Sequence, residues 1–272
     1  MCQVLQVSRA GYYKWQRRLL RQDTRSDDFT VVKIKSIFNL HRRRYGARRI
    51  KNELNKEGIR ISLKKVNRLM KAHNLVSLHN RKRFRVVTTN SKHKEPIAPN
   101  VVNREFVAEG PDEVWLADIT YIRTKEGWLY LAVVLDLCLR KIVGFKMSDK
   151  LDTSLVLGAL DQALIHRRPS KGLIFHSDRG VQYASGDFRE ALAKAYAVQS
   201  MSRKGDCWDN APTESFFATL KKELIFQEKY DTRFQAKSAV FEYIEAYYNA
   251  IRQHSSLGDL SPNEFERAFK VA

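Results

Sequence analysis

The chain has 272 residues and carries 49 Lys and Arg against 30 Asp and Glu, a formal net charge of +19. This length provides one full hydrophobic core and a smaller module. Its longest apolar run, residues 129–139, is interrupted by Asp136 and is too short to span a bilayer. No amino-terminal export pattern is visible, and three cysteines are too few for a disulfide framework or a thiolate zinc site. We therefore expect a cytoplasmic protein without a membrane partner.

The positive charge is concentrated in the first part of the chain. Residues 1–110 contain 27 Lys and Arg against 8 Asp and Glu, whereas residues 111–272 contain 22 of each. A basic module joined to a neutral core predicts that the first part binds a polyanion on which the second part acts chemically. The alternative is a generically basic protein without a nucleic-acid role.

The amino-terminal region, residues 1–76, is predicted to be all helical. Residues 27–41 have a helical apolar pattern, and two further short helices are predicted over 47–57 and from a cap at Ser62, with Gly58 in the turn between them. Two short helices joined by a turn indicate a helix-turn-helix that binds DNA, although a plain three-helix bundle with solvated charges would have the same pattern. The expected DNA contacts in this region are Arg48, Arg49, Lys64, Lys65 and Arg68.

Residues 77–111 have a different composition, with few apolar periodicities and three prolines. They include the basic cluster 81–85, in which Arg81 and Arg83 are candidate DNA contacts. We interpret this segment as an extended, basic linker that lies along phosphates. A flexible tether with solvated charges is the alternative.

From residue 112 to residue 272 the pattern is that of an α/β core followed by C-terminal helices. The first three predicted strands follow one another with tight turns, as in an antiparallel meander, and each of the last two follows a helix, as in a parallel crossover. We therefore expect a mixed sheet. The predicted strands are 114–122, 128–136, 140–147, 172–178 and 197–201, and the predicted helices are 152–167, 186–195, 211–226 and 233–251.

Three carboxylates stand out in this core. Asp118 lies inside an apolar, β-branched run, Asp178 ends a second such run, and Glu214 comes early in a predicted helix. A carboxylate in a buried strand is costly unless it has a cation or a hydrogen-bond donor. Hard ions such as Mg²⁺ bind carboxylate oxygens, and a pair of them can hold the attacking and leaving oxygens of a phosphodiester. The three residues therefore indicate a shared divalent metal site.

Extended motifs surround the three carboxylates, and 35 residues separate Asp178 from Glu214. Together they resemble the catalytic core of DDE transposases, and more closely the OrfB-type transposases of bacterial insertion sequences, in the retroviral-integrase superfamily. Segment 41–50 also resembles the upstream helix-turn-helix of that family, and segment 248–262 its C-terminal signature, so nearly the whole chain is covered. The three core motifs are Trp115-x-x-Asp118-Ile-Thr-Tyr121, His176-Ser-Asp178-Arg-Gly-Val-Gln-Tyr183 and Asp209-Asn-Ala-Pro-Thr-Glu214-Ser-Phe-Phe.

The resemblance implies a ribonuclease-H-like mixed-sheet core that cleaves and joins the ends of an insertion sequence by phosphodiester hydrolysis and transesterification. Asp118 would bridge two Mg²⁺ ions, for which Mn²⁺ can substitute, and Asp178 and Glu214 would each complete the shell of one ion. The implied partners are double-stranded DNA (element ends and target DNA), further copies of the chain in a homo-oligomer on DNA, and the upstream-frame protein of the same element. The expected location is the bacterial cytoplasm, at the nucleoid.

Two other classes of function remain open. One is a ribonuclease-H-like nuclease that cleaves nucleic acid without strand transfer, and the other is a non-catalytic DNA-binding regulator from a decayed transposase. The complete set of carboxylates argues against decay, and the basic helix-turn-helix favours duplex DNA over RNA hybrids.

Two residues near Asp178 are further candidates for DNA contacts. His176 lies two positions before Asp178, so on a strand both side chains face the same side. It is expected either to orient DNA or a metal-bound water, or to be a satisfied histidine behind the site. Arg179 follows Asp178 directly and is the second candidate.

The helix with Glu214 carries two more candidates. Asn210 lies one turn before Glu214 and is expected to contact substrate or the carboxylate, or simply to cap the helix. Lys221 lies two turns after Glu214 on the same helical face, where the family carries a basic residue near the DNA end, whereas Lys222 would face elsewhere.

Acidic and aromatic neighbours of Glu214 could be mistaken for parts of the site. Asp206 and Asp209 precede the helix in a glycine- and proline-containing turn, and we interpret them as turn and cap residues. Trp208 is interpreted as a packing residue, with a stacked, flipped base as the alternative.

Overall fold

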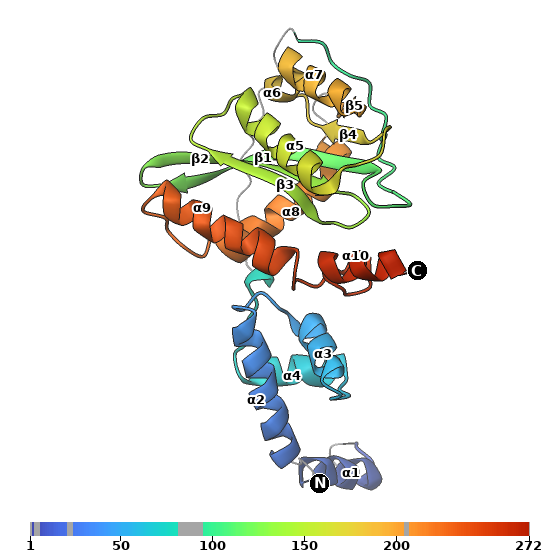
Figure 1. The fold of residues 1–272 in the computed structure, drawn as a ribbon. Coiled ribbons are helices and arrows are strands. Elements are labelled where there is room, and N and C mark those ends of the chain that lie inside the picture. The colour runs from blue at the N-terminus through green and yellow to red at the C-terminus, as the bar shows by residue number, and fades with distance from the viewer. Residues whose placement is uncertain (1, 3–5, 21–23, 81–94, 204–206, 272) are drawn as a thin grey trace. The chain divides into compact units, whose positions relative to one another are not determined.

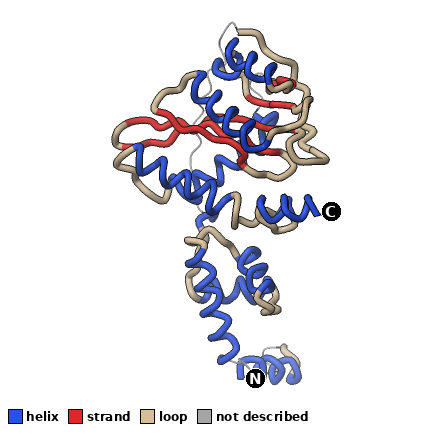
Figure 2. Tube along the Cα trace, viewed as in Figure 1, coloured by secondary structure: helices blue, strands red, loops and turns tan. Residues whose placement is uncertain are grey.

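The computed structural model describes residues 2, 6–20, 24–80, 95–203 and 207–271. Its chain divides into two compact units, residues 1–81 and 82–272, and each is described by itself (Figure 1). Where it is described, the first unit forms helices and no strand, whereas the second combines a sheet with helices (Figure 2). In the described part of the chain no helix is long and apolar enough to cross a bilayer.

The first unit is built around three helices that pack on one another: α2, α3 and α4. Its centre consists of apolar side chains that are fully buried, among them Ile34, Ile50, Leu54 and Val66. The helices of this unit are α1 (Arg9–Leu20), α2 (Thr24–Leu40), α3 (Ala47–Lys56), α4 (Leu63–Ala72) and the 3₁₀ turn η1 (Leu78–Asn80).

The helix-turn-helix predicted over α3 and α4 is present. Gly58 in the turn has φ +80°, a left-handed conformation that glycine adopts without strain. Ser62 caps α4, because its side chain accepts a hydrogen bond from the backbone N–H of Lys65. Ile50 and Leu54 of α3 are buried. These two apolar side chains lie on one face of the short helix, and that face packs against the rest of the unit.

The second unit contains a five-stranded mixed sheet with strand order β3-β2-β1-β4-β5. The pairs β1–β2 and β2–β3 are antiparallel, and the pairs β1–β4 and β4–β5 are parallel. This is the meander followed by parallel crossovers that the sequence predicted, and it confirms the ribonuclease-H-like class. The strands are β1 (Val114–Thr124), β2 (Gly127–Asp136), β3 (Ile142–Ser148), β4 (Ile174–Ser177) and β5 (Val198–Met201).

Helices cover the sheet from two sides. Helix α5 packs on β2 and β3 and contacts α6 and α7, whereas α8 and α9 pack on β1. Figure 1 shows α8 and α9 on the other side of the sheet from α6 and α7. The helices are α5 (Thr153–Arg167), α6 (Val181–Ala184), α7 (Gly186–Lys194), η2 (Cys207–Asn210), α8 (Ala211–Leu220), α9 (Arg233–Glu242), η5 (Ser255–Leu257) and α10 (Pro262–Val271).

Two helices predicted as continuous change their winding. In the segment predicted as a helix over 211–226, α8 ends at Leu220 and a π-helical turn follows, η3 (Lys221–Ile225). In the segment predicted over 233–251, α9 is likewise followed by a π-helical turn, η4 (Tyr243–Tyr248). A π-turn inserts an extra residue per turn and so rotates the side chains that follow. In both turns this places polar side chains in the interior, where Tyr243 of η4 donates to Glu223 of η3.

The linker predicted over 77–111 is not extended throughout. The backbone N–H of Met201 in β5 donates to the carbonyl of Pro99 (3.3 Å), and that of Val101 donates to Ser200 Oγ (2.9 Å). Val102 is buried. The carboxyl-terminal part of the segment is therefore docked along β5 as part of the core, whereas Arg81 and Arg83 lie outside the described residues.

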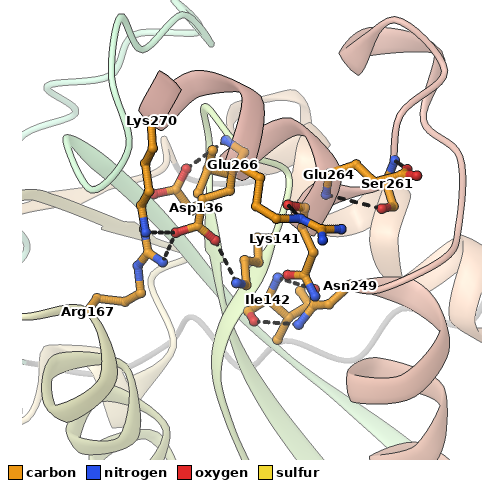
Figure 3. Close-up of polar contacts among 12 residues, drawn as sticks. Asp136, Lys141, Ile142, Arg167, Asn249, Ser261, Glu264, Glu266 and Lys270 are labelled. Atoms are coloured by element: carbon orange, nitrogen blue, oxygen red, sulfur yellow. Dashed lines mark hydrogen bonds and ion pairs between the residues drawn. The ribbon is translucent and has the colours of Figure 1, made fainter. Parts of the chain in front are cut away.

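Helix α10 is not among the predicted elements, although its start carries a capping box. Glu264 N–H donates to Ser261 Oγ, and Ser261 N–H donates to Glu264 (Figure 3). The helix is attached to the core by Glu266, which pairs with Lys141 (2.7 Å) and Arg167 (2.6 Å). Burial opposes ionisation of this carboxylate, but the two hydrogen bonds prevail and lower the pKa of Glu266 to about 2.

Candidate active site

The positions of Asp118 and Asp178 follow from the register of β1 and β4. These parallel strands pair only as far as Leu116 and His176. Asp118 and Asp178 are each two residues beyond that last pair. They therefore occupy equivalent positions where the two strands part, with Asp118 inside β1 and Asp178 directly after the end of β4.

The electrostatics of Asp118 show which groups gather around it. Burial raises its pKa well above the ordinary value, and the charges of Asp178 and Glu214 raise it further. The backbone N–H of Ile119 donates to its Oδ1 (2.8 Å) and opposes the rise, as does the positive charge of Lys221. The three predicted carboxylates and the predicted lysine thus lie close enough to interact, although their catalytic role stays a prediction.

Asn210 fixes the start of α8 against β1. Its Nδ2 donates to the carbonyl of Ala117 (3.0 Å), the residue before Asp118. The hydroxyl of Thr213 donates to the carbonyl of Asn210 (3.0 Å) and also contacts its side-chain oxygen. Asn210 stands at the N-cap position, but its side chain makes no capping hydrogen bond. It docks the helix instead, and so brings Glu214, in the first turn, to the site.

Lys221 is half-buried at the start of η3. Its Nζ lies 5.8 Å from the centre of the Tyr121 ring, which belongs to β1. Burial lowers its pKa, and the carboxylate of Asp118 opposes that change. Lys221 therefore interacts electrostatically with Asp118, and its role as a DNA contact stays a prediction.

His176 and Arg179 contact the protein itself. His176 is fully buried, with Nδ1 2.8 Å from Ser200 Oγ and Nε2 3.2 Å from Ser202 Oγ. Burial lowers its pKa to about 4, which keeps the ring neutral near pH 7. Arg179 Nε donates to the carbonyl of Ser202 (2.6 Å). Of the two expectations for His176, the geometry favours the satisfied interior histidine, because both ring nitrogens are engaged.

Asp209 is a structural centre rather than a simple turn residue. It is fully buried and pairs with Arg203 (2.8 Å) and Arg104 (2.9 Å). Asn100 Nδ2 also donates to it (2.9 Å). The hydrogen bond from Arg203 holds its pKa far below the ordinary value. The sequence did not reveal these partners, because two of them lie more than 100 residues earlier in the chain. Asp206 and the side chain of Trp208 lie outside the described part of the structure.

The predicted DNA contacts of the first unit differ in their surroundings. Lys65 and Arg68 of α4 pair with Asp27 of α2 at 2.7 and 3.0 Å, so they also hold two helices together. Arg48 and Lys64 are exposed. The guanidinium of Arg49 lies 5.4 Å from the centre of the Tyr45 ring.

The atoms that could bind a metal ion at this site are carboxylate oxygens. Within the described residues, no group of three or more His, Cys, Asp or Glu side chains is gathered closely enough to hold a metal ion. The carboxylates of Asp118, Asp178 and Glu214 nevertheless provide only hard oxygen donors. Both neighbours raise the pKa of Asp118, so negative charge is in excess there. A divalent cation such as Mg²⁺ would offset that excess, and the oxygen donors of these three residues are of the kind that it binds.

Comparison with known proteins agrees with this architecture. The chain matches an HTH-like domain over residues 24–83 and integrase core domains over 108–207 and 214–268. Among solved structures, the HTLV-2 integrase catalytic core domain in complex with magnesium (dimeric form) covers 57% of this chain and is itself covered to 97%, with 15% identity and a TM-score of 0.45. The family models define the class: a DNA-binding helical region joined to an integrase core.

Two relatives identify the family within that class. The insertion element IS600 uncharacterized 31 kDa protein of Shigella sonnei is 43% identical over 269 residues, which cover 99% of this chain and 98% of that protein. The transposase InsF for insertion sequence IS3A of Escherichia coli (strain K12) is 41% identical over 271 residues, covering 98% and 92%. The chain belongs to the IS3-type insertion-sequence transposases, and the resemblance found in its motifs is confirmed.

Proposed function

We propose that this transposase cleaves and joins the ends of its insertion sequence at Asp118, Asp178 and Glu214. The observation that supports the proposal is that Asp118 of β1 interacts electrostatically with Asp178, which follows β4, and with Glu214, in the first turn of α8. Two Mg²⁺ ions, with Mn²⁺ as a substitute, would supply Lewis-acid stabilisation for the attacking and leaving oxygens of the phosphodiester.

The other groups of the site have distinct tasks. Asp118 would hold both ions, because it interacts electrostatically with both of the other carboxylates. Lys221 places a cation beside them, suited to a phosphate of the DNA end. Asn210 holds α8 on β1 and so keeps Glu214 in reach of Asp118. The chain itself needs no nucleophilic side chain, because water and then a DNA 3′-hydroxyl attack.

DNA binding is assigned to residues 1–76, and catalysis to residues 112–272. Arg48 and Lys64 are exposed on α3 and α4, where a phosphate backbone can reach them. Joining two element ends requires that two sites meet, so we propose a homo-oligomer on DNA, with the upstream-frame protein of the same element as a further partner.

Amide substitutions test the three carboxylates. Asp118→Asn, Asp178→Asn and Glu214→Gln should each abolish Mg²⁺-dependent cleavage of element-end DNA while DNA binding is retained. Each amide keeps the side-chain volume but removes the charge that a hard cation requires. The losses should be strongly non-additive, because a site without its metals fails as a unit. Asp161→Asn, on the exposed side of α5, is the matched control and should cleave normally.

The assay follows cleavage, joining and gel shift in parallel, with the upstream-frame protein present. Near-normal cleavage by one of the three variants would remove that residue from the site. Cleavage by the wild-type protein without joining would favour the nuclease. Binding without any cleavage would favour the decayed regulator.

A further inference from the structure

Tyr183 has a buried hydroxyl that the fold leaves without a partner. The residue belongs to α6 and is 1% exposed, and its ring packs edge-on against Phe188 at 5.4 Å between centroids. Among the described residues, nothing forms a hydrogen bond with its hydroxyl. A buried unpaired hydroxyl destabilises a protein, and phenylalanine would pack in the same way without that cost. The hydroxyl therefore calls for an explanation other than packing.

The surroundings of Gly180 place the Tyr183 ring near Asp178. A Cβ built on Gly180 would lie 2.9 Å from Asp178 Oδ1 and 3.7 Å from Cδ2 of the Tyr183 ring, so both side chains flank the same point. Two backbone hydrogen bonds fix this turn. Gly180 N–H donates to Asp178 Oδ1 (2.9 Å), and Tyr183 N–H donates to the carbonyl of Gly180 (3.0 Å).

The charge pattern around the hydroxyl agrees with that placement. Burial, and after it the negative charges of Asp118 and Asp178, raise the pKa of Tyr183 well above its ordinary value. The phenol O–H is a hydrogen-bond donor. Its neighbours Asp118 and Asp178 are acceptors when ionised.

We propose that Tyr183 is a positioning residue whose hydroxyl donates to a carboxylate oxygen of the Asp118–Asp178 pair when the site is loaded with divalent cation. This rests on the proposed metal-dependent function. A side chain that binds the unused oxygen of a ligating carboxylate fixes the direction of the other oxygen, and such support commonly changes metal affinity by 10- to 100-fold. The Tyr183 hydroxyl has no partner among the described residues, and it would donate to a carboxylate oxygen when these residues hold a divalent cation.

The proposal predicts opposite effects of one substitution with and without metal. In the metal-free protein, Tyr183→Phe should unfold at the same temperature as the wild type or higher, because an unpaired hydroxyl is removed. With Mg²⁺, the variant should need about 10-fold more cation for half of the thermal stabilisation and for half-maximal cleavage of element-end DNA.

Tyr243→Phe is the matched control, since its hydroxyl donates to Glu223 at 2.8 Å. It should lower the metal-free unfolding temperature yet keep the wild-type Mg²⁺ midpoint. A wild-type Mg²⁺ midpoint in Tyr183→Phe would overturn the proposal. So would a metal-free loss of stability as large as that of Tyr243→Phe, because the hydroxyl would then have a structural partner. A wild-type protein that neither cleaves nor gains stability with Mg²⁺ would instead refute the proposed function itself.

Discussion

Replacing Arg252 is expected to destabilise the catalytic unit strongly. Its guanidinium binds Glu223 through Nη2 at 2.9 Å and through Nε at 3.1 Å, and Glu223 also accepts from the Tyr243 hydroxyl. Glu223 is 2% exposed and Arg252 is 5% exposed, so water replaces neither partner. Arg252→Met keeps much of the side-chain length but removes the positive charge that is paired with the buried Glu223 carboxylate.

The expected magnitude follows from this burial. Removing one partner of a buried ion pair costs about 3–5 kcal/mol. A domain of this size loses about 2–4 °C in Tm per kcal/mol, so Arg252→Met should lower the Tm by about 6–20 °C. The variant's cleavage activity, measured below its lowered Tm, should also be reduced, because Glu223 lies in the π-helical turn that begins with Lys221.

The assay is thermal unfolding of four proteins: wild type, Arg252→Met, Glu223→Gln and the double variant. The double variant should recover much of the loss, since neither charge is then left unpaired in the interior. Arg189→Met is the matched control, because Arg189 is exposed and lies 4.0 Å from Glu95, and it should change stability by less than about 0.5 kcal/mol. An Arg252→Met shift no larger than that of the control would refute the reasoning, as would fully additive single variants.

Three further outcomes are expected. A fragment of residues 82–272 should bind duplex DNA much more weakly than the full chain does. The slope of its log affinity against log salt concentration should be flatter by about 0.9 for each lost phosphate contact. Undiminished binding would contradict the DNA-binding role of the first unit. Lys221→Ala should reduce cleavage more than Lys222→Ala, at a cost of about 1–3 kcal/mol, and equal activity would remove Lys221 from the site. Glu266→Gln should cost at most about 3 kcal/mol at neutral pH, because the pKa of Glu266 is lowered to about 2 in the folded protein. Since that contribution is present above the unfolded pKa of about 4.5 and is lost as the pH falls toward 2, the variant and the wild type should converge in acid unfolding; a constant difference between them would contradict it.

Local patterns in the sequence determined most elements of both units. The apolar, β-branched run around Asp118 formed β1, and Ser62 capped α4 as predicted. These outcomes depend on neighbouring residues in the chain, which is why periodicity and capping rules reach them. The motifs around Asp118, Asp178 and Glu214 likewise sufficed to identify the family.

The tertiary structure alone decided which distant groups meet. The register of Leu116 against His176 places Asp118 beside Asp178, and no local pattern contains that pairing. The buried pair of Glu223 and Arg252 is a second case, because 29 residues separate its partners and a π-turn directs one of them inward.

Contacts made by segments without a periodic apolar pattern also could not be predicted from the sequence. Residues 99–102, predicted as part of an extended linker, dock on β5 through backbone groups that any sequence carries. Asp209 pairs with Arg104, 105 residues earlier in the chain, and the Tyr183 hydroxyl has no hydrogen-bond partner among the described residues. The sequence by itself thus determined the elements, the family and the candidate carboxylates. Only the packed chain decided their neighbours, because burial and pairing depend on segments that folding brings together from distant positions.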